Sequence, residues 1–153
     1  MRLVVQRVRQ ASVHVDGTSV AAIGTGLLVL VGFGAEDAEA KTWSSIEATL
    51  RKLPLLRIFP GHGKHMNTSL IDVSGEILLV SQFTLYADCG KGRRPSFHLA
   101  CAPLDAATLY DKVCEAMRFI LPGKVQSGIF AADMNVSLTN WGPVTLILDS
   151  NDM

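Results

Sequence analysis

Apolar residues dominate the first third of the chain and predict strands there. The segments 2–15, 19–24 and 26–34 are rich in Val, Leu and Ala and contain few charges. Such runs, bounded by turn residues, are typical of strands. Asp16 and Gly17 separate the first two segments, and an Asp-Gly pair between strand-forming runs is the strongest hairpin signal in this sequence. We therefore expect a hairpin followed by a third strand.

Two later segments change to a helical period. Over 37–53, apolar residues recur every three or four positions, and Pro54 ends the pattern. Over 103–121 the same period recurs, with Pro103 at the first helical position, which proline favours. The sequence predicts two helices with these apolar stripes: Trp43, Ile46, Leu50 and Leu53 in the first, and Leu109, Val113, Met117 and Ile120 in the second.

The rest of the chain returns to strand patterns. We expect a short strand at 55–59, a polar loop at 60–69, and a long strand at 76–88 whose apolar first half is buried on both faces. The segments 134–139 and 144–148 also read as strands, separated by Gly142-Pro143, for which the simplest interpretation is a turn. The order of elements predicts one compact α/β domain over residues 1–153, with a mixed sheet covered by two main helices.

Composition narrows the classes of function. The chain has 153 residues, of which 48% are hydrophobic, and 14 basic residues balance 14 acidic ones. No apolar run reaches the roughly 20 residues that span a bilayer, so we expect a soluble, cytoplasmic protein without membrane contact. Zero net charge argues against binding along a long nucleic-acid backbone, so we expect no DNA partner and only local contact with any nucleic acid. Cys89, Cys101 and Cys114 lack metal-ligand spacing, and His62 and His65 lack a third ligand, so we expect reduced thiols, no metal and no cofactor.

Three short segments stand above this background. "SQFTL" (81–85) places hydroxyl and amide groups at the end of an apolar strand, although many strands simply turn polar where they reach solvent. Lys91, Arg93 and Arg94 put three positive charges in a loop that either binds phosphate or is merely solvated. Phe130 precedes small residues, as an aromatic platform for a base requires, but a core phenylalanine has the same pattern.

These segments, taken in order along the chain, resemble those of the D-aminoacyl-tRNA deacylases. Each motif is weak alone, but a match of all of them in register is highly specific. The resemblance covers essentially the whole chain. It rests on "QRV" (6–8), "GLLVLVG" (26–32), "SQFTL" (81–85), "RPSF" (94–97), "FAADMNVSL" (130–138) and "GPVT" (142–145).

The resemblance implies a three-layer β/β/α fold and a homodimer. In this family the Gly142-Pro143 bond is cis, and its backbone carbonyls reach into the partner subunit's pocket to accept the substrate ammonium group. Such a motif admits a D-residue or glycine and collides with an L-residue. Arg7 resembles the arginine that holds the motif through a carbonyl hydrogen bond. One departure from the family pattern is Trp141, where an acidic residue is common.

The activity that the resemblance implies is hydrolysis of the ester between a D-amino acid and the terminal adenosine of tRNA. The catalytic segment is then Ser81, Gln82, Phe83 and Thr84, with the amides around the last two binding the carbonyl oxygen. Phe130 and Met134 are expected to bind substrate, with Phe130 in the adenine pocket. Lacking a neighbouring base, Thr84 is a poor nucleophile, so we expect attack by water.

Lys91, Arg93 and Arg94 are candidates to contact phosphates of the acceptor stem. Two alternatives remain at this stage: an editing deacylase for small L-amino acids, and a non-catalytic module that binds the end of tRNA.

Overall fold

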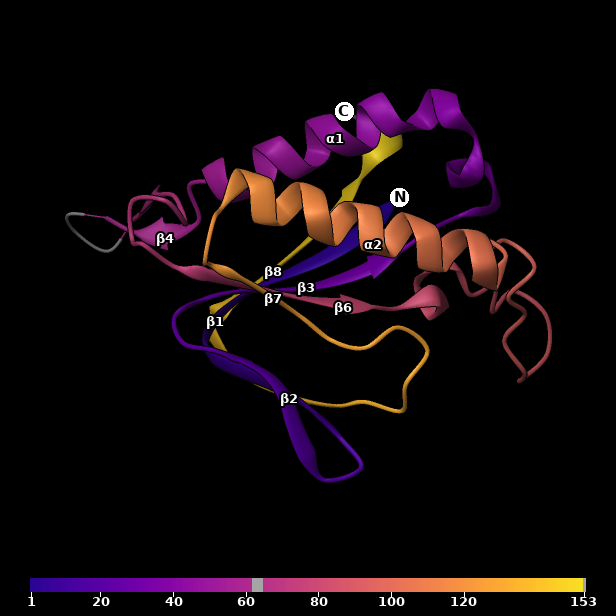
Figure 1. The fold of residues 1–153 in the computed structure, drawn as a ribbon, viewed down its shortest axis with the longest axis horizontal. Helices are drawn as coiled ribbons and strands as arrows, with labels where there is room; N and C mark the ends of the chain where they lie inside the picture. The colour runs from indigo at the N-terminus through magenta and orange to yellow at the C-terminus, as the bar shows by residue number, and fades with distance from the viewer. Residues whose placement is uncertain (62–64, 153) are drawn as a thin grey trace.

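A six-stranded mixed sheet with two α-helices on one face forms the body of the protein in a computed structural model, which describes residues 1–61 and 65–152 (Figure 1). Phe59–Pro60 and Met66–Thr68 pair as a separate two-stranded ribbon. The strands are β1 (Arg2–Val15), β2 (Thr18–Ile23), β3 (Gly26–Gly32), β4 (Phe59–Pro60), β5 (Met66–Thr68), β6 (Glu76–Ser81), β7 (Val125–Ser127) and β8 (Asn135–Asp149), and the α-helices are α1 (Trp43–Lys52) and α2 (Pro103–Ile120).

The long first strand organises the sheet. The strands follow the order β2-β1-β3-β6-β7, and β8 pairs with the other side of β1. β1 is antiparallel to β2, β3 and β8, whereas β3, β6 and β7 are mutually parallel. β3 pairs with the first half of β1 and β2 with the second half, so β1 extends from one part of the sheet into another.

Buried side chains form two clusters on opposite faces of the central strands. In β6, Ile77 and Leu79 belong to the cluster under the helices, whereas Leu78 and Val80 belong to the cluster with the far halves of β1 and β2. β3 alternates in the same way, because successive side chains of a strand point to opposite faces. The sheet is therefore covered by helices on one side and by its own folded-over strands on the other (Figure 1). The predicted mixed sheet with two main helices is confirmed.

The first predicted helix is shorter at its start than expected. Residues 37–42 form separate 3-10 turns, and α1 begins at Trp43. Glu39 is extended, which interrupts the helix, and the Asp37 side chain is directed into the protein. There it accepts hydrogen bonds from the Met1 amine at 2.6 Å and from the Gly34 N–H at 2.7 Å. The second helix agrees with the prediction to within one residue.

Two predicted strands are also wrong in part. The strand expected at 55–59 forms only at Phe59, because a 3-10 turn over Leu53–Leu55 prolongs α1 past Pro54. The strand expected at 76–88 ends at Ser81, and the chain then forms the 3-10 turn η4 (Phe83–Tyr86). The last pair between β3 and β6 is Val31 with Ser81. Beyond it, Leu85 donates its N–H to the carbonyl of Gln82 within the turn.

The turn expected at Gly142-Pro143 is replaced by a bulge within one continuous strand. β8 runs from Asn135 to Asp149, and the Gly142-Pro143 bond inside it is cis. Residues 141–144 all lie opposite Arg7, since Asn140 pairs with Val8 and Thr145 with Gln6. The extra residues bulge outward while pairing continues on both sides, so local turn signals do not end the strand.

The chain ends meet beside the helical layer. Besides Asp37, the Met1 amine donates a hydrogen bond to Ser150 Oγ at 2.7 Å, and the Ser150 N–H donates to the Met1 carbonyl at 2.8 Å. Across the described residues, neither α-helix is long and apolar enough to cross a membrane.

Candidate active site

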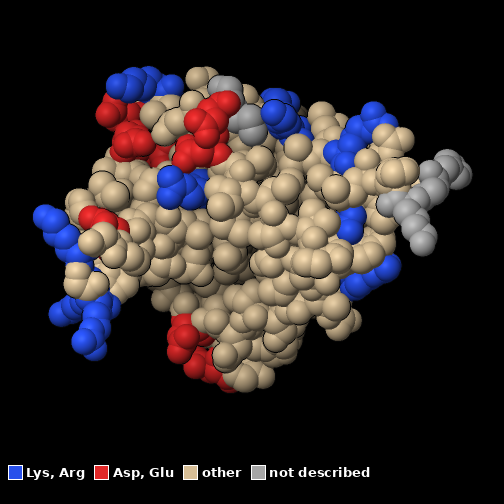
Figure 2. Space-filling view, turned by 180° about the vertical axis from the view of Figure 1, so that it is seen from behind, with Lys and Arg blue, Asp and Glu red and all other residues tan. Residues whose placement is uncertain are grey.

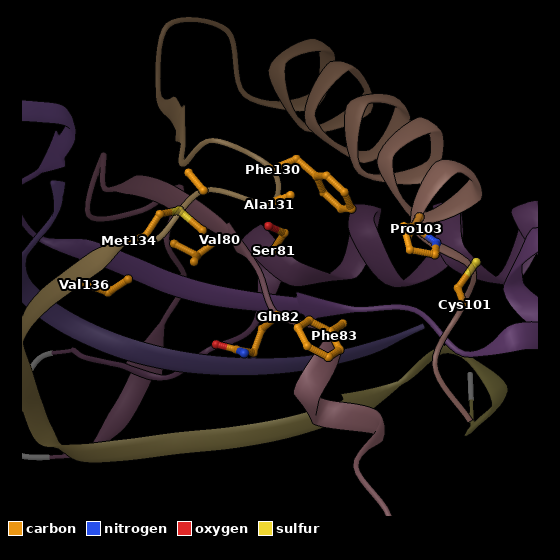
Figure 3. A pocket seen from close by; sticks show the side chains of 12 residues that line it. Val80, Ser81, Gln82, Phe83, Cys101, Pro103, Phe130, Ala131, Met134 and Val136 are labelled. Carbon is orange, nitrogen blue, oxygen red and sulfur yellow. The ribbon is translucent and has the colours of Figure 1, made fainter. Parts of the chain in front are cut away.

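A cavity of about 480 Å³ opens where β6 ends. In Figure 3, Val80 and Met134 lie at one end of the cavity and Cys101 and Pro103 at the other, with Ser81 between them. Its volume is in the range of ordinary ligand pockets. The lining residues are Val80, Ser81, Gln82, Phe83, Cys101, Pro103, Ala106, Phe130, Ala131, Ala132, Met134 and Val136.

Three stretches of chain meet at this cavity because parallel strands bring their carboxyl ends to one edge of the sheet. Ser81 is the last residue of β6, and η4 begins two residues later. The segment 130–134 connects β7, the parallel neighbour of β6, to β8. α2 begins at Pro103 on the third side. The topology thus brings together Ser81, Gln82, Phe83, Phe130 and Met134 of the predicted site.

Phe130 is fixed by a buried tyrosine. The rings of Phe130 and Tyr110 pack with centroids 5.9 Å apart, and the Tyr110 hydroxyl donates a hydrogen bond to the Leu79 carbonyl at 2.9 Å. Burial raises the pKa of the Tyr110 phenol, so it remains a donor at neutral pH. Phe130 is neither a fully buried core residue nor free, since it is partly buried and lines the cavity.

A second aromatic pair joins the cavity to the basic loop. Phe83 and Phe97 pack edge to face with centroids 4.9 Å apart. Asp88 and Ser96 exchange two backbone hydrogen bonds of 2.8 and 2.9 Å that close the loop between them. Figure 2 shows Lys and Arg side chains projecting from the end of the molecule that carries this loop. All three predicted phosphate contacts, Lys91, Arg93 and Arg94, are exposed.

Thr84 stands apart from the cavity lining. It is exposed, and its Oγ1 accepts a hydrogen bond from Gln82 Nε2 at 2.6 Å. Among the described residues, no carboxylate, imidazole or amine side chain lines the cavity. Burial raises the pKa of the Cys101 thiol, the one titratable group in that lining, which keeps it neutral. The cavity therefore offers hydrogen bonds and aromatic surface but no conventional general base.

Gly142, Pro143 and Arg7 lie away from the cavity of their own chain. Gly142 and Pro143 are exposed on β8 and do not line it. Arg7 is 5% exposed, donates from Nε to the Trp141 carbonyl at 2.7 Å, and donates from Nη1 to the Ile58 carbonyl. Burial, and secondarily the positive charge of Arg9, lowers the pKa of the Arg7 guanidinium. Arg7 thus holds the backbone directly before Gly142.

Several lining residues have no counterpart in the sequence-based prediction. The small residues after Phe130 were expected to permit close approach, and Ala131 and Ala132 do line the cavity. Nothing in the sequence singles out the remaining five, because they are small or apolar: Val80, Cys101, Pro103, Ala106 and Val136.

The histidine pair considered for a metal is only partly described. His62 lies outside the described residues, and His65 is exposed. Within the described part of the chain, no three His, Cys, Asp or Glu side chains are grouped as metal ligands.

Comparison with known proteins identifies the family. The sequence model of the D-Tyr-tRNA(Tyr) deacylase family matches residues 4–149. A D-aminoacyl-tRNA deacylase of Solidesulfovibrio magneticus is 58% identical over 100% of this chain and 98% of its own length. One of Nitratidesulfovibrio vulgaris is 55% identical over 100% of this chain and 95% of its own length. The chain belongs to this deacylase family, and it is accordingly an enzyme of the hydrolase class.

Two solved structures share the fold. One, described as "c-Myc DNA Unwinding Element Binding Protein", has a TM-score of 0.89 and 42% identity, covering 97% of this chain and 98% of that one. Another, of a probable eukaryotic D-amino acid tRNA deacylase, has a TM-score of 0.81 and 22% identity, covering 96% and 97%. At this lower identity the second likeness concerns the fold alone.

Proposed function

We propose that this enzyme hydrolyses the ester bond between a D-amino acid and the terminal adenosine of tRNA, releasing free D-amino acid and tRNA. The observation that carries the proposal is the convergence of Ser81, Gln82, Phe83, Phe130 and Met134 on one cavity, in a chain of the deacylase family. Because the proposed substrate is an aminoacyl-tRNA, we also propose that the enzyme acts in the cytoplasm.

The aromatic part of the cavity suits an adenosine. Phe130 is backed by Tyr110, and Met134 also lines the cavity. A flat aromatic ring and a polarisable thioether both pack well against a base. We therefore assign adenine binding to Phe130 and Met134, and we assign the aminoacyl ester to the part of the cavity beside Ser81.

The 3-10 turn η4 suits stabilisation of charge on the ester oxygen. Its first N–H groups, those of Phe83 and Thr84, have no earlier carbonyl within the turn to accept them. We assign these two groups to the carbonyl oxygen as it becomes negative, an interaction worth about 2.7–4 kcal/mol per donor in other hydrolases. Ser81 and Gln82 shape the pocket beside them.

Water is the nucleophile in this proposal. The described lining has no basic side chain, and among the described residues the Thr84 hydroxyl has one hydrogen-bond partner, the amide of Gln82. Water adds to the ester carbon with help from the neighbouring ribose hydroxyl. The bond between the carbonyl carbon and the ribose oxygen then breaks, that oxygen takes up the proton that the attacking water loses, and the free amino acid and the tRNA leave. An ester is already activated, so orientation and charge stabilisation suffice.

Selection of the D-form is assigned to Gly142 and Pro143 of a second copy. Both residues are exposed and neither lines the cavity of its own chain, so one chain alone does not place them at its pocket. Among the described strands β8 pairs only with β1, and Ile147 on it is 70% exposed. A long, partly apolar edge strand is a surface that a second chain readily covers. In the proposed homodimer, the backbone carbonyls of Gly142 and Pro143 accept the substrate ammonium group.

Backbone selection has a consequence for glycine. An L-side chain would collide with the inserted backbone, whereas a D-side chain points to the open side. Glycine has no side chain to exclude, so we propose that glycyl-tRNA is also cleaved.

Comparing D-tyrosyl-tRNA with L-tyrosyl-tRNA and glycyl-tRNA tests the activity directly. We expect rapid release of D-tyrosine, measurable release of glycine and negligible release of L-tyrosine. Preference for small L-aminoacyl groups would instead identify an editing deacylase for L-amino acids. Binding of tRNA without turnover of any ester would identify a non-catalytic module.

Mixing two inactive variants tests the shared site. Gly142→Ala should be inactive, because a Cβ there would come within 2.8 Å of Arg7 Nη2 and the φ of +143° disfavours a side chain. Phe130→Ala should be nearly inactive, because it removes the aromatic ring from the cavity lining. Half of randomly mixed dimers contain one chain of each kind and one intact composite site, so co-refolding should restore about a quarter of wild-type activity. If verified mixed dimers recover no activity, Gly142 and Phe130 act in the site of the same chain, and the proposed shared site is wrong.

DNA binding is a second candidate, favoured by the description of one similar structure. Zero formal net charge disfavours it for a long duplex. Competition between unlabelled tRNA and duplex DNA for the enzyme separates the candidates. We expect tRNA to displace DNA and DNA to leave the deacylation rate unchanged.

A further inference from the structure

A stacked arginine and tryptophan stand beside Gly142. The Arg9 guanidinium lies over the Trp141 ring, with its central carbon 3.4 Å from the ring centroid. Arg9 is exposed, whereas Trp141 is partly buried and packs edge to face against Phe59 at 6.2 Å. We call the pair of Arg9 and Trp141 the Arg9–Trp141 stack. It presents a flat cation to solvent on the residue directly before Gly142.

Two positively charged guanidinium groups, those of Arg7 and Arg9, lie against the Trp141 ring without an acidic partner among the described residues. Arg7 also approaches the Trp141 ring, at 4.7 Å from its centroid, and is almost fully buried. Arg7 and Arg9 form no ion pair with any described residue, and the charge of Arg9 helps to lower the pKa of Arg7. Two neighbouring guanidinium groups repel each other, and an anion bound between them and solvent would relieve that repulsion. The local field therefore favours a negatively charged ligand.

The surroundings reinforce this preference. Figure 2 shows Lys and Arg side chains, with no Asp or Glu among them, at the end of the molecule that carries β4 in Figure 1. β4 is close to the stack, because Arg7 binds the Ile58 carbonyl and Phe59 packs against Trp141. The chain as a whole is neutral, so this positive region is local rather than a general property.

We propose that the Arg9–Trp141 stack binds the single-stranded nucleotides that precede the terminal adenosine of the tRNA. This rests on the proposed function, in which Gly142 and Pro143 enter the partner's cavity and so bring Trp141 to its mouth. A strand whose last nucleoside occupies that cavity must leave past the same point. The guanidinium pairs with a backbone phosphate, and its flat face, supported by the indole, stacks on a base.

The occupant is RNA rather than a free anion, because the stack combines two chemistries. A phosphate alone needs only charge and hydrogen-bond donors, and the two buried donors of Arg7 are already bound to carbonyls. A planar cation held flat against an indole additionally offers a surface for an aromatic ring. A single strand with splayed bases provides both groups at adjacent positions.

Two substrates distinguish this inference from the proposed function. One is D-tyrosyl-tRNA, and the other is adenosine carrying D-tyrosine on its ribose, which lacks the preceding nucleotides. For Arg9→Gln we expect the ratio of kcat/KM on tRNA to kcat/KM on the nucleoside to fall about tenfold. The slope of log affinity for uncharged tRNA against log salt should become shallower by about 1. If the wild-type enzyme cleaves neither substrate, the proposed function itself fails.

Two further variants complete the test. Arg51→Gln removes a charge of the same sign from α1, where Arg51 is exposed and pairs with Glu47, and should leave ratio and slope unchanged. Arg9→Lys keeps the positive charge but has no planar group. It should therefore keep the wild-type salt slope, but it should recover less than half of the fall in the kcat/KM ratio that Arg9→Gln causes. Folding of each variant is checked by thermal unfolding. If Arg9→Gln and Arg51→Gln give the same ratio of kcat/KM values and the same salt slope, the inference is wrong. If Arg9→Lys keeps the wild-type ratio, charge rather than stacking on a planar group is what the RNA recognises.

Discussion

Arg2 donates a hydrogen bond from Nη1 to the backbone carbonyl of Leu85 at 2.9 Å, which ties the start of β1 to η4. Its guanidinium also lies 4.9 Å from the centroid of the Tyr86 ring. Arg2 therefore contacts the turn that presents Phe83 and Thr84 but not the cavity itself. We therefore expect Arg2 to act as a positioning residue for η4.

Removing that support should slow turnover more than it weakens binding. For Arg2→Ala we expect kcat to fall about tenfold, or about 1.4 kcal/mol, with KM changed less than threefold. Asp149→Asn is the matched control, since it removes the 3.3 Å ion pair of Arg2 and leaves the Leu85 carbonyl in place. Steady-state kinetics on D-tyrosyl-tRNA measures both. An equal loss in the two variants would argue that Arg2 acts only through stability.

The Thr84 hydroxyl should be dispensable for chemistry. Because its hydrogen-bond partner is an amide rather than a base, Thr84→Ala should keep kcat within about tenfold of wild type, and Thr84→Ser within about twofold. Single-turnover assays with D-tyrosyl-tRNA measure the chemical step. Loss of turnover in Thr84→Ala with tRNA binding intact would instead favour covalent catalysis.

The basic loop should supply few phosphate contacts. Wild-type tRNA binding is expected to depend only weakly on salt, and Arg93→Gln/Arg94→Gln should make the slope shallower by about 2. Lys41→Gln/Arg51→Gln removes the same charge from exposed sites elsewhere and serves as the control. A steep wild-type slope, or equal effects of the two double variants, would contradict this role.

The buried terminal ion pair should contribute to stability. Asp37→Asn leaves the Met1 amine without its carboxylate in a fully buried site, so we expect the free energy of unfolding to fall by about 3–5 kcal/mol. Glu39→Gln breaks an exposed pair with Lys41 and should change it little. Urea unfolding followed by circular dichroism compares them. Equal, small changes would show that the buried pair is not needed for stability.

Tyr110 should give the fold a dependence on alkaline pH. Burial raises the pKa of its phenol above the unfolded value, so its contribution to stability is complete below a pH of about 10 and is lost as the pH rises further. Tyr110→Phe loses the hydrogen bond to Leu79, which should cost about 1 kcal/mol at neutral pH. It should also lose less stability than wild type between about pH 8 and pH 10.5. If the unfolding free energies of wild type and Tyr110→Phe change equally with pH over this range, Tyr110 is not the source of the pH dependence.

The sequence predicts the regular elements better than their ends. The apolar runs of β3 and β6 identify buried strands, because both faces of each strand are covered. The end of β6 was missed because Phe83, Leu85 and Tyr86 are strand-forming residues that here belong to a 3-10 turn. Local pattern cannot show that β6 loses its pairing partner there, which is a property of the whole sheet.

The site is predictable only where residues carry recognisable chemistry. Motif resemblance selected five residues of the cavity, but Cys101 and Pro103 reach it through the placement of α2, which no local signal encodes. Gly142 shows the opposite case. Its neighbours favour a turn, yet pairing of β8 with β1 on both sides keeps the strand continuous.

The lining of the cavity also bears on how the enzyme responds to the condition of the cell. Among the described residues it holds no group that gains or loses a proton near neutrality, since its only titratable side chain is a thiol whose pKa burial raises. A catalyst built this way has no ionisable group in its described lining that would be protonated when its surroundings become mildly acidic. The proposed hydrolysis is therefore expected to keep nearly the same rate from neutral to mildly acidic pH.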